Sequence, residues 1–133
     1  MKGVRTNQSR GIPIGAEVEV VDNSGAKMVK IMGVKGFKSI KRKLECGGVG
    51  DMFTAHVIKG KPDMKHNVVK CVLVRQKQEY KRPDGTNVKF QSNGVVVLKD
   101  EKGNPKGTIV KGVIAKEVGD RFPAVARIAN IIV

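Results

Sequence analysis

Residues 70–98 read KCVLVRQKQEYKRPDGTNVKFQSNGVVVL, and this stretch decides the fold. Two short apolar runs, CVLV at 71–74 and VVVL at 95–98, flank a polar and basic middle. Short runs rich in β-branched residues and bounded by turn residues are typical of buried strands. Between them lies the turn motif Arg82-Pro83-Asp84-Gly85. Proline presets φ, the aspartate side chain can bond its own backbone, and glycine accepts a positive φ. The stretch therefore predicts two core strands joined by a ribbon that reverses at 82–85.

The composition points to a polyanionic partner. The 133 residues include 26 Lys and Arg against 12 Asp and Glu, which gives a net charge of +14. A chain this basic repels itself and gains most from a polyanion, so nucleic acid is the first candidate. An anionic membrane is the second, but no amphipathic helix with one basic face is evident, so we expect no membrane partner. Two cysteines, no secretory signal and no membrane-length apolar run favour a soluble protein of a reducing compartment.

Further β-type segments precede and follow the central stretch. Turn residues at 22–25 join the first two, and Gly33 predicts a bulge or a sharp bend within the second. The glycines at 47–50 suit a barrel corner better than a nucleotide loop. The expected strands are 17–21, 27–35, 52–59, 69–75, 87–90 and 95–98. We expect a mainly β fold, in which a barrel with its ribbon spans residues 12–110.

The pattern changes near the C-terminus. Residues 113–118 suit one or two helical turns ending at Gly119, and Asp120 is a plausible N-cap for a helix with Pro123 in its first turn. Phe122, Val125, Ala126 and Ala129 fall on one helical face, and the apolar end 131–133 should dock. The expected organisation is a single domain, 1–133, with a basic tail at 1–11 and a helical cap at 111–133.

Basic side chains in the tail, in the acid-free stretch 36–43 and on the ribbon are the candidate contacts to RNA phosphates. We expect these to be Arg10, Lys38, Lys41, Arg42, Lys43, Lys77, Lys81 and Arg82. The competing interpretations are a frayed terminus and a solvated loop. With only 4% aromatic residues, stacking of several bases is disfavoured, and recognition of RNA backbone and shape is expected instead.

Catalysis and metal binding find little support. Cys46, His56, His66 and Cys71 lack the short spacings of structural zinc ligands, so neither a metal nor another cofactor is expected. No Ser-His-Asp grouping stands out, although a spatial one is not visible in sequence. An RNA-processing enzyme would have to use residues such as Asp22, Asp51 or His56.

Three stretches together resemble one family. They are VVDNSGAK at 20–27, then VLVR at 72–75 with the RPDG turn and Phe90, and finally KGT at 106–108 with Gly112 and AKE at 115–117. In this order and spacing they resemble the universal large-subunit ribosomal protein fourteen. The longer N-terminus and the segment around Pro123 look like the archaeal and eukaryotic branch. Cys71, where Gly or Ala is usual, and residues 36–44 depart from the family pattern.

The resemblance implies a five-stranded barrel with a protruding β-ribbon and small C-terminal helices. It implies a structural constituent of the cytoplasmic large ribosomal subunit that binds large-subunit rRNA. It further implies a place at the subunit interface, beside other large-subunit proteins and small-subunit rRNA, with a part in an intersubunit bridge. In this branch the C-terminal region resembles the docking surface for a subunit anti-association factor.

Two functions from other classes compete with this one. A free barrel-type RNA chaperone or translation factor would bind many single strands transiently, and an RNA-processing enzyme would turn RNA over. Under the ribosomal hypothesis, the C-terminal helices are the expected protein-contact surface because they are less basic and more apolar. The side chains expected there are Phe122, Val125 and Ala129.

Overall fold

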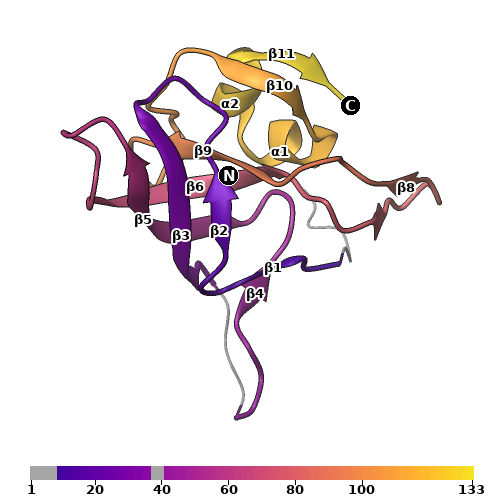
Figure 1. Ribbon diagram of the computed structural model, residues 1–133. Helices are drawn as coiled ribbons and strands as arrows, with labels where there is room; N and C mark the ends of the chain where they lie inside the picture. The colour runs from indigo at the N-terminus through magenta and orange to yellow at the C-terminus, as the bar shows by residue number, and fades with distance from the viewer. Residues whose placement is uncertain (1–8, 37–40) are drawn as a thin grey trace.

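A curled sheet of five antiparallel strands forms the core of the fold (Figure 1). The computed structural model describes residues 9–36 and 41–133. In sheet order the strands are β2 (Glu17–Glu19), β3 (Ala26–Val34), β5 (Met52–Gly60), β6 (Val68–Arg75) and β9 (Gly94–Leu98). The curl brings the outer strands together, because Val20 bridges Val95 in parallel and its neighbour Val21 donates its N–H to the Val95 oxygen at 3.0 Å. The predicted mainly β, five-stranded fold is confirmed, as a half-barrel.

The two apolar runs at 71–74 and 95–98 are buried on both faces. Residues 71–74 of β6 and 95–97 of β9 are fully buried, because one face lines the inside of the curled sheet and the C-terminal elements pack near the other. The Ala115 N–H donates to the Val74 oxygen at 2.9 Å and ties that C-terminal segment to β6. The bulge predicted at Gly33 is confirmed by a register shift between Ile31 and Gly33 in the pairing of β3 with β5.

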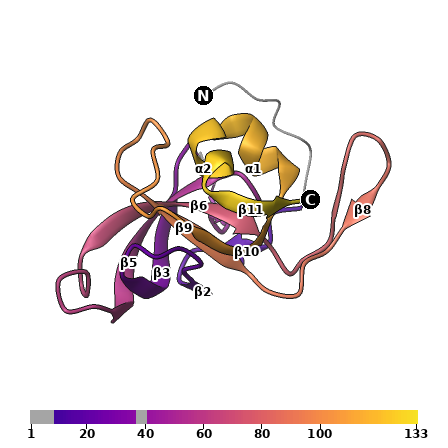
Figure 2. The same ribbon diagram turned by 90° about the horizontal axis from the view of Figure 1, so that it is seen from above.

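The predicted ribbon is a short antiparallel hairpin that projects from the sheet (Figure 2). It pairs β7 (Tyr80–Lys81) with β8 (Asn87–Val88), so the strand expected at 87–90 is shorter than predicted. At the reversal, the Gly85 N–H donates to the Arg82 oxygen at 2.9 Å, and Gly85 has a φ of 93°. The Thr86 N–H donates to Asp84 Oδ1 at 2.9 Å, so the local turn chemistry read from the sequence operates as expected.

The C-terminal segment corrects several predictions. The helix expected at 113–118 is wrong in its first half, because Val113 and Ile114 belong to a strand, β10 (Val110–Ile114). Helix α1 (Lys116–Arg121) begins after Ala115 and contains Asp120, which therefore does not cap the next helix. Phe122 is the N-cap of α2 (Pro123–Arg127), with Pro123 in the first turn as predicted. The first helix does not end at Gly119, and Ala129 belongs to a strand and not to the helical face expected for Phe122, Val125 and Ala126.

The reason for the first error lies outside the local sequence. Strand β11 (Ala129–Ile132) pairs in parallel with β10, with Val113 opposite Ile131 and Ile114 opposite Ile132. A pairing partner that arrives after two helices cannot be seen in residues 113–118, which read equally well as helix or strand. A further two-stranded sheet joins β1 (Ile12–Pro13) to β4 (Cys46–Gly47). Within the described residues, no helix is long and apolar enough to cross a membrane.

The two thiols should differ sharply in reactivity. Burial, followed by the charge of Asp22, raises the pKa of the Cys71 thiol to about 12, whereas Cys46 is partly exposed. Because the thiolate is the reactive form, we expect a disulfide reagent at pH 8 to label the folded protein at Cys46 alone. The Cys46→Ser variant should stay unlabelled until denaturant is added. Rapid labelling of folded Cys46→Ser would show that β6 opens easily.

Candidate nucleic-acid interface

Six of the eight predicted RNA-binding cations are exposed to solvent or to a partner. They are Arg10, Lys41, Arg42, Lys43, Lys77 and Lys81. Lys38 lies outside the described residues. Residues 41–44 form an exposed run before β4, and Arg42 has a left-handed φ of 72°. This run projects at one end of the molecule, while the C-terminal helices lie at the opposite end (Figure 1).

The fold brings Arg10 to the base of the ribbon. The buried Gln76 side chain donates from Nε2 to the main-chain oxygens of Ser9 and Gln78, each at 3.0 Å. The Lys77 N–H is in turn held by Asn93 Oδ1 at 2.7 Å. Arg10 and Lys77, 67 positions apart, therefore share one region of the surface. Gln76, which sequence reasoning passed over, makes this connection.

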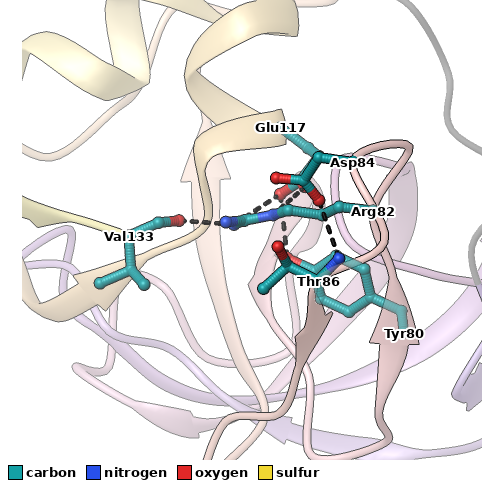
Figure 3. Close-up of polar contacts among 6 residues, drawn as sticks. All are labelled: Tyr80, Arg82, Asp84, Thr86, Glu117 and Val133. Atoms are coloured by element: carbon teal, nitrogen blue, oxygen red, sulfur yellow. Dashed lines mark hydrogen bonds and ion pairs between the residues drawn. The ribbon is translucent and has the colours of Figure 1, made fainter.

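Arg82 has a carboxylate partner inside the protein, Glu117 (Figure 3). Its Nε lies 2.7 Å from Glu117 Oε1, and Nη2 donates to the main-chain oxygen of Val133 at 2.6 Å. The Tyr80 hydroxyl donates to Glu117 Oε2 at 2.9 Å. We call Tyr80, Arg82, Glu117 and Val133 the ribbon anchor. The structure thus gives Arg82 an anchoring role in place of a free charge for phosphate.

The electrostatics of the ribbon anchor agree with its geometry. The hydrogen bond to Glu117 raises the pKa of Arg82, so the guanidinium stays charged. Burial first, and then the hydrogen bond to Glu117, raises the pKa of the Tyr80 phenol, so the hydroxyl remains a donor. Only 16% of the Arg82 and 12% of the Glu117 side chain is exposed, which shields the ion pair from solvent.

Arg75, at the start of the ribbon, is also a structural cation. Its Nη1 donates to the main-chain oxygens of Lys111 and Val113, each at 3.3 Å. Gly112 lies against the guanidinium with a φ of 82°, and a Cβ there would come within 2.5 Å of Nη1. Arg75 therefore joins β6 to β10 and does not extend along the ribbon.

The predicted protein-contact side chains lie mostly inside the molecule. Phe122 and Val125 are 1% and 0% exposed, and Ala129 is partly buried at the start of β11. This corrects the expectation that Phe122 and Val125 face a partner, because the apolar helical face covers the chain's own core. The exposed apolar side chains of this segment are Ile131, Ile132 and Val133.

The residues named for a hypothetical catalytic site have separate structural settings. Buried Asp22 accepts hydrogen bonds from Val97 and Ser24, and Asp51 accepts one from Gly48 N–H at 2.8 Å and pairs with Arg121. His56 lies on β5, opposite Lys30 and Val68. Within residues 9–36 and 41–133, no three His, Cys, Asp or Glu side chains form a group able to hold a metal ion.

Fold and surface together define a class: a small, strongly basic β protein that presents its cations on a ribbon and on loops. The family model described as Ribosomal protein L14p/L23e matches residues 11–133. The chain belongs to this family, which makes it a structural constituent of the large ribosomal subunit in the cytoplasm.

Two curated relatives have the same length as this chain. A large ribosomal subunit protein uL14 from Nanoarchaeum equitans is 50% identical over 133 residues, which cover all of both chains. Another, from Thermoplasma acidophilum, is 44% identical over the same full length. Both organisms are archaeal, and the predicted resemblance to the archaeal and eukaryotic branch is confirmed.

Proposed function

We propose that this chain binds large-subunit rRNA directly, at the face of the large subunit that meets the small subunit. There it contributes to an intersubunit bridge, in contact with small-subunit rRNA. The observation that carries this proposal is the exposure of the cationic run 41–43 and of Lys77 and Lys81 on the ribbon. These cations lie on segments that project from the sheet, where a phosphate backbone can reach them.

The contacts proposed are electrostatic and read RNA shape. Each Lys or Arg that neutralises a phosphate releases counterions, so affinity falls steeply as salt rises. The ribbon suits this task because the ribbon anchor holds it against the C-terminal segment while Lys77 and Lys81 remain exposed. A ribbon fixed in direction loses less conformational entropy on binding than a free loop does.

Protein partners are proposed for the C-terminal edge. Strand β11 and the residue after it present Ile131, Ile132 and Val133, each about half exposed (54%, 49% and 51%). Exposed apolar side chains on an edge strand are typical of protein interfaces. Neighbouring large-subunit proteins and a subunit anti-association factor are the partners proposed for this edge.

The RNA contact of residues 41–43 can be tested by matched triple substitutions. Replacing Lys41, Arg42 and Lys43 with alanine should weaken binding to archaeal large-subunit rRNA about 10- to 100-fold, and lower the salt slope by about 2–3. The control is a triple alanine variant of Lys102, Lys111 and Lys116, which are exposed and lie on other segments. It removes the same charge, so equal losses in both variants would mean that net charge alone drives binding.

Residence on the ribosome separates this function from that of a transient RNA chaperone. On a sucrose gradient of cell extract, the chain should sediment with the large subunit in stoichiometric amount and resist moderate salt. Recovery at the top of the gradient would contradict the proposed function and favour the chaperone.

A further inference from the structure

A groove runs across the outer face of the sheet, under the loop formed by residues 99–107. Thr54 and Lys70 face outward here, since their neighbours Phe53 and Cys71 are fully buried on the inner side. Gly33 pairs with Thr54, so the small residues of β3 and β5 leave this part of the face hollow. A second hollow of the groove begins at Lys70 and extends past Leu98. This second hollow has a volume of about 750 Å³.

Lysines from distant parts of the chain line the groove along its length. Among the described residues they are Lys35, Lys70, Lys99 and Lys106. Three segments contribute them, the chain just after β3, strand β6 and the loop 99–107, so no local run of charge marks the groove in the sequence. Sequence reasoning missed all four for that reason.

Two of the acidic side chains in the groove accept hydrogen bonds from N–H groups of the groove's rim. Glu45 Oε1 accepts the Val34 N–H at 2.6 Å. Asp100 accepts the Lys102 N–H and the Asn104 side-chain amide, each at 3.0 Å. These hydrogen bonds hold the backbone of the rim, and in the described part of the chain neither carboxylate forms an ion pair with a lysine of the groove.

Glu101 is placed differently, because its carboxylate lies among the lysines. It pairs with Lys70 at the point where the two hollows of the groove meet. Lys70 first, and then Lys35, lower the pKa of Glu101, so it is an anion at neutral pH. The pair is open to solvent, with 38% of the Lys70 and 62% of the Glu101 side chain exposed. Exposed ion pairs contribute little to stability, so a competing anion can displace Glu101 easily.

We propose that this groove is an additional binding site for RNA phosphates, in which the Glu101 carboxylate occupies the place of a phosphate until RNA displaces it. Lys70 is the central cation, with Lys35 on one side and Lys99 and Lys106 on the other. The proposal rests on the proposed rRNA binding and extends it to a groove that none of the predicted contacts in the described residues lines.

Removing the internal competitor should strengthen binding. The Glu101→Gln variant should bind archaeal large-subunit rRNA about three- to tenfold more tightly than the matched Glu19→Gln variant, with a salt slope steeper by about 1. Glu19 is an exposed acid on β2, so the control removes the same charge from another part of the sheet. Adding Lys70→Met to Glu101→Gln should abolish the gain.

Lysine footprinting supplies a readout at the groove itself. In the wild-type complex, Lys70 should be protected from acylation by bound RNA, and the protection should increase in Glu101→Gln. If wild-type protein fails to bind rRNA at all, the proposed function falls. If it binds while Glu101→Gln matches Glu19→Gln and Lys70 stays unprotected, the groove proposal alone is overturned.

Discussion

Replacement of Glu117 by alanine should lower the free energy of unfolding by about 3 kcal/mol, because it leaves a partly buried guanidinium without its carboxylate. Glu117 accepts from Arg82 Nε at 2.7 Å and from the Tyr80 hydroxyl at 2.9 Å. Both donors lose their charged acceptor together, and a polar group left unpaired costs more than its bond contributed. Denaturant unfolding of wild type and variant gives the difference.

Two companion variants divide this loss. Tyr80→Phe removes only the phenol's hydrogen bond and should cost about 1 kcal/mol. A paired replacement, Arg82→Met with Glu117→Leu, removes both charges and should be less destabilising than the sum of its single substitutions. A loss below about 1 kcal/mol for Glu117→Ala would mean that the pair behaves as an ordinary surface pair.

The same substitution should loosen the ribbon locally. Arg82 and Tyr80 are the ribbon's side of the anchor, and α1 and Val133 are the other side (Figure 3). Amide hydrogen exchange in β7 and β8 should accelerate in Glu117→Ala, while the fully buried centre of β6 changes less. Equal acceleration throughout the sheet would instead indicate a global loss of stability.

Local sequence signals predicted most of the fold. The β-branched runs at 71–74 and 95–98, the turn at 82–85 and Gly33 each act over a few residues, and the structure has a strand, a reversal or a bulge at each. The strand at 113–114 escaped prediction because its partner, β11, comes 15 or more positions later. Pairing over that distance leaves no periodic signal in either segment.

The candidate site was less predictable for the same reason. A run of cations is visible in sequence, and residues 41–43 are exposed as expected. In the sequence, Arg82 and its neighbour Lys81 are equivalent candidates for phosphate contact. Only the structure shows that Glu117, 35 positions away, lies within hydrogen-bond distance of Arg82. The sequence likewise suggested that Phe122 and Val125 form a contact surface, whereas in the structure both side chains are buried in the core. Composition reveals how much charge a chain carries, whereas only the fold shows which charges are already neutralised.

Asp22 belongs to a turn motif and also connects distant strands of the fold. The DNSG motif predicts a turn, but Asp22 also lies where the sheet curls shut. It bridges Val110, while its neighbour Val21 bonds β9 on one side and accepts the Lys111 N–H at 2.7 Å on the other. The Asp22 side chain is 6% exposed, and its Oδ2 accepts the Val97 N–H of β9 at 2.9 Å.

Replacing Asp22 with alanine should therefore cost about 3 kcal/mol or more, since hydrogen bonds to a buried carboxylate are among the strongest in a protein. Three donors lose their acceptor: the Val97 N–H, the Ser24 N–H at 3.2 Å and the Ser24 hydroxyl at 2.6 Å. Asp22→Asn keeps the shape but has one acceptor oxygen, so it should lose about half as much. Asp120→Ala removes the same charge from an exposed position on α1 and should change stability little. Thermal and denaturant unfolding of the three variants measure these losses. Equal losses in Asp22→Ala and Asp120→Ala would mean that only the removed charge matters. The expected order, with the largest loss in Asp22→Ala and the smallest in Asp120→Ala, would show that the Asp22 carboxylate stabilises the closure of the sheet.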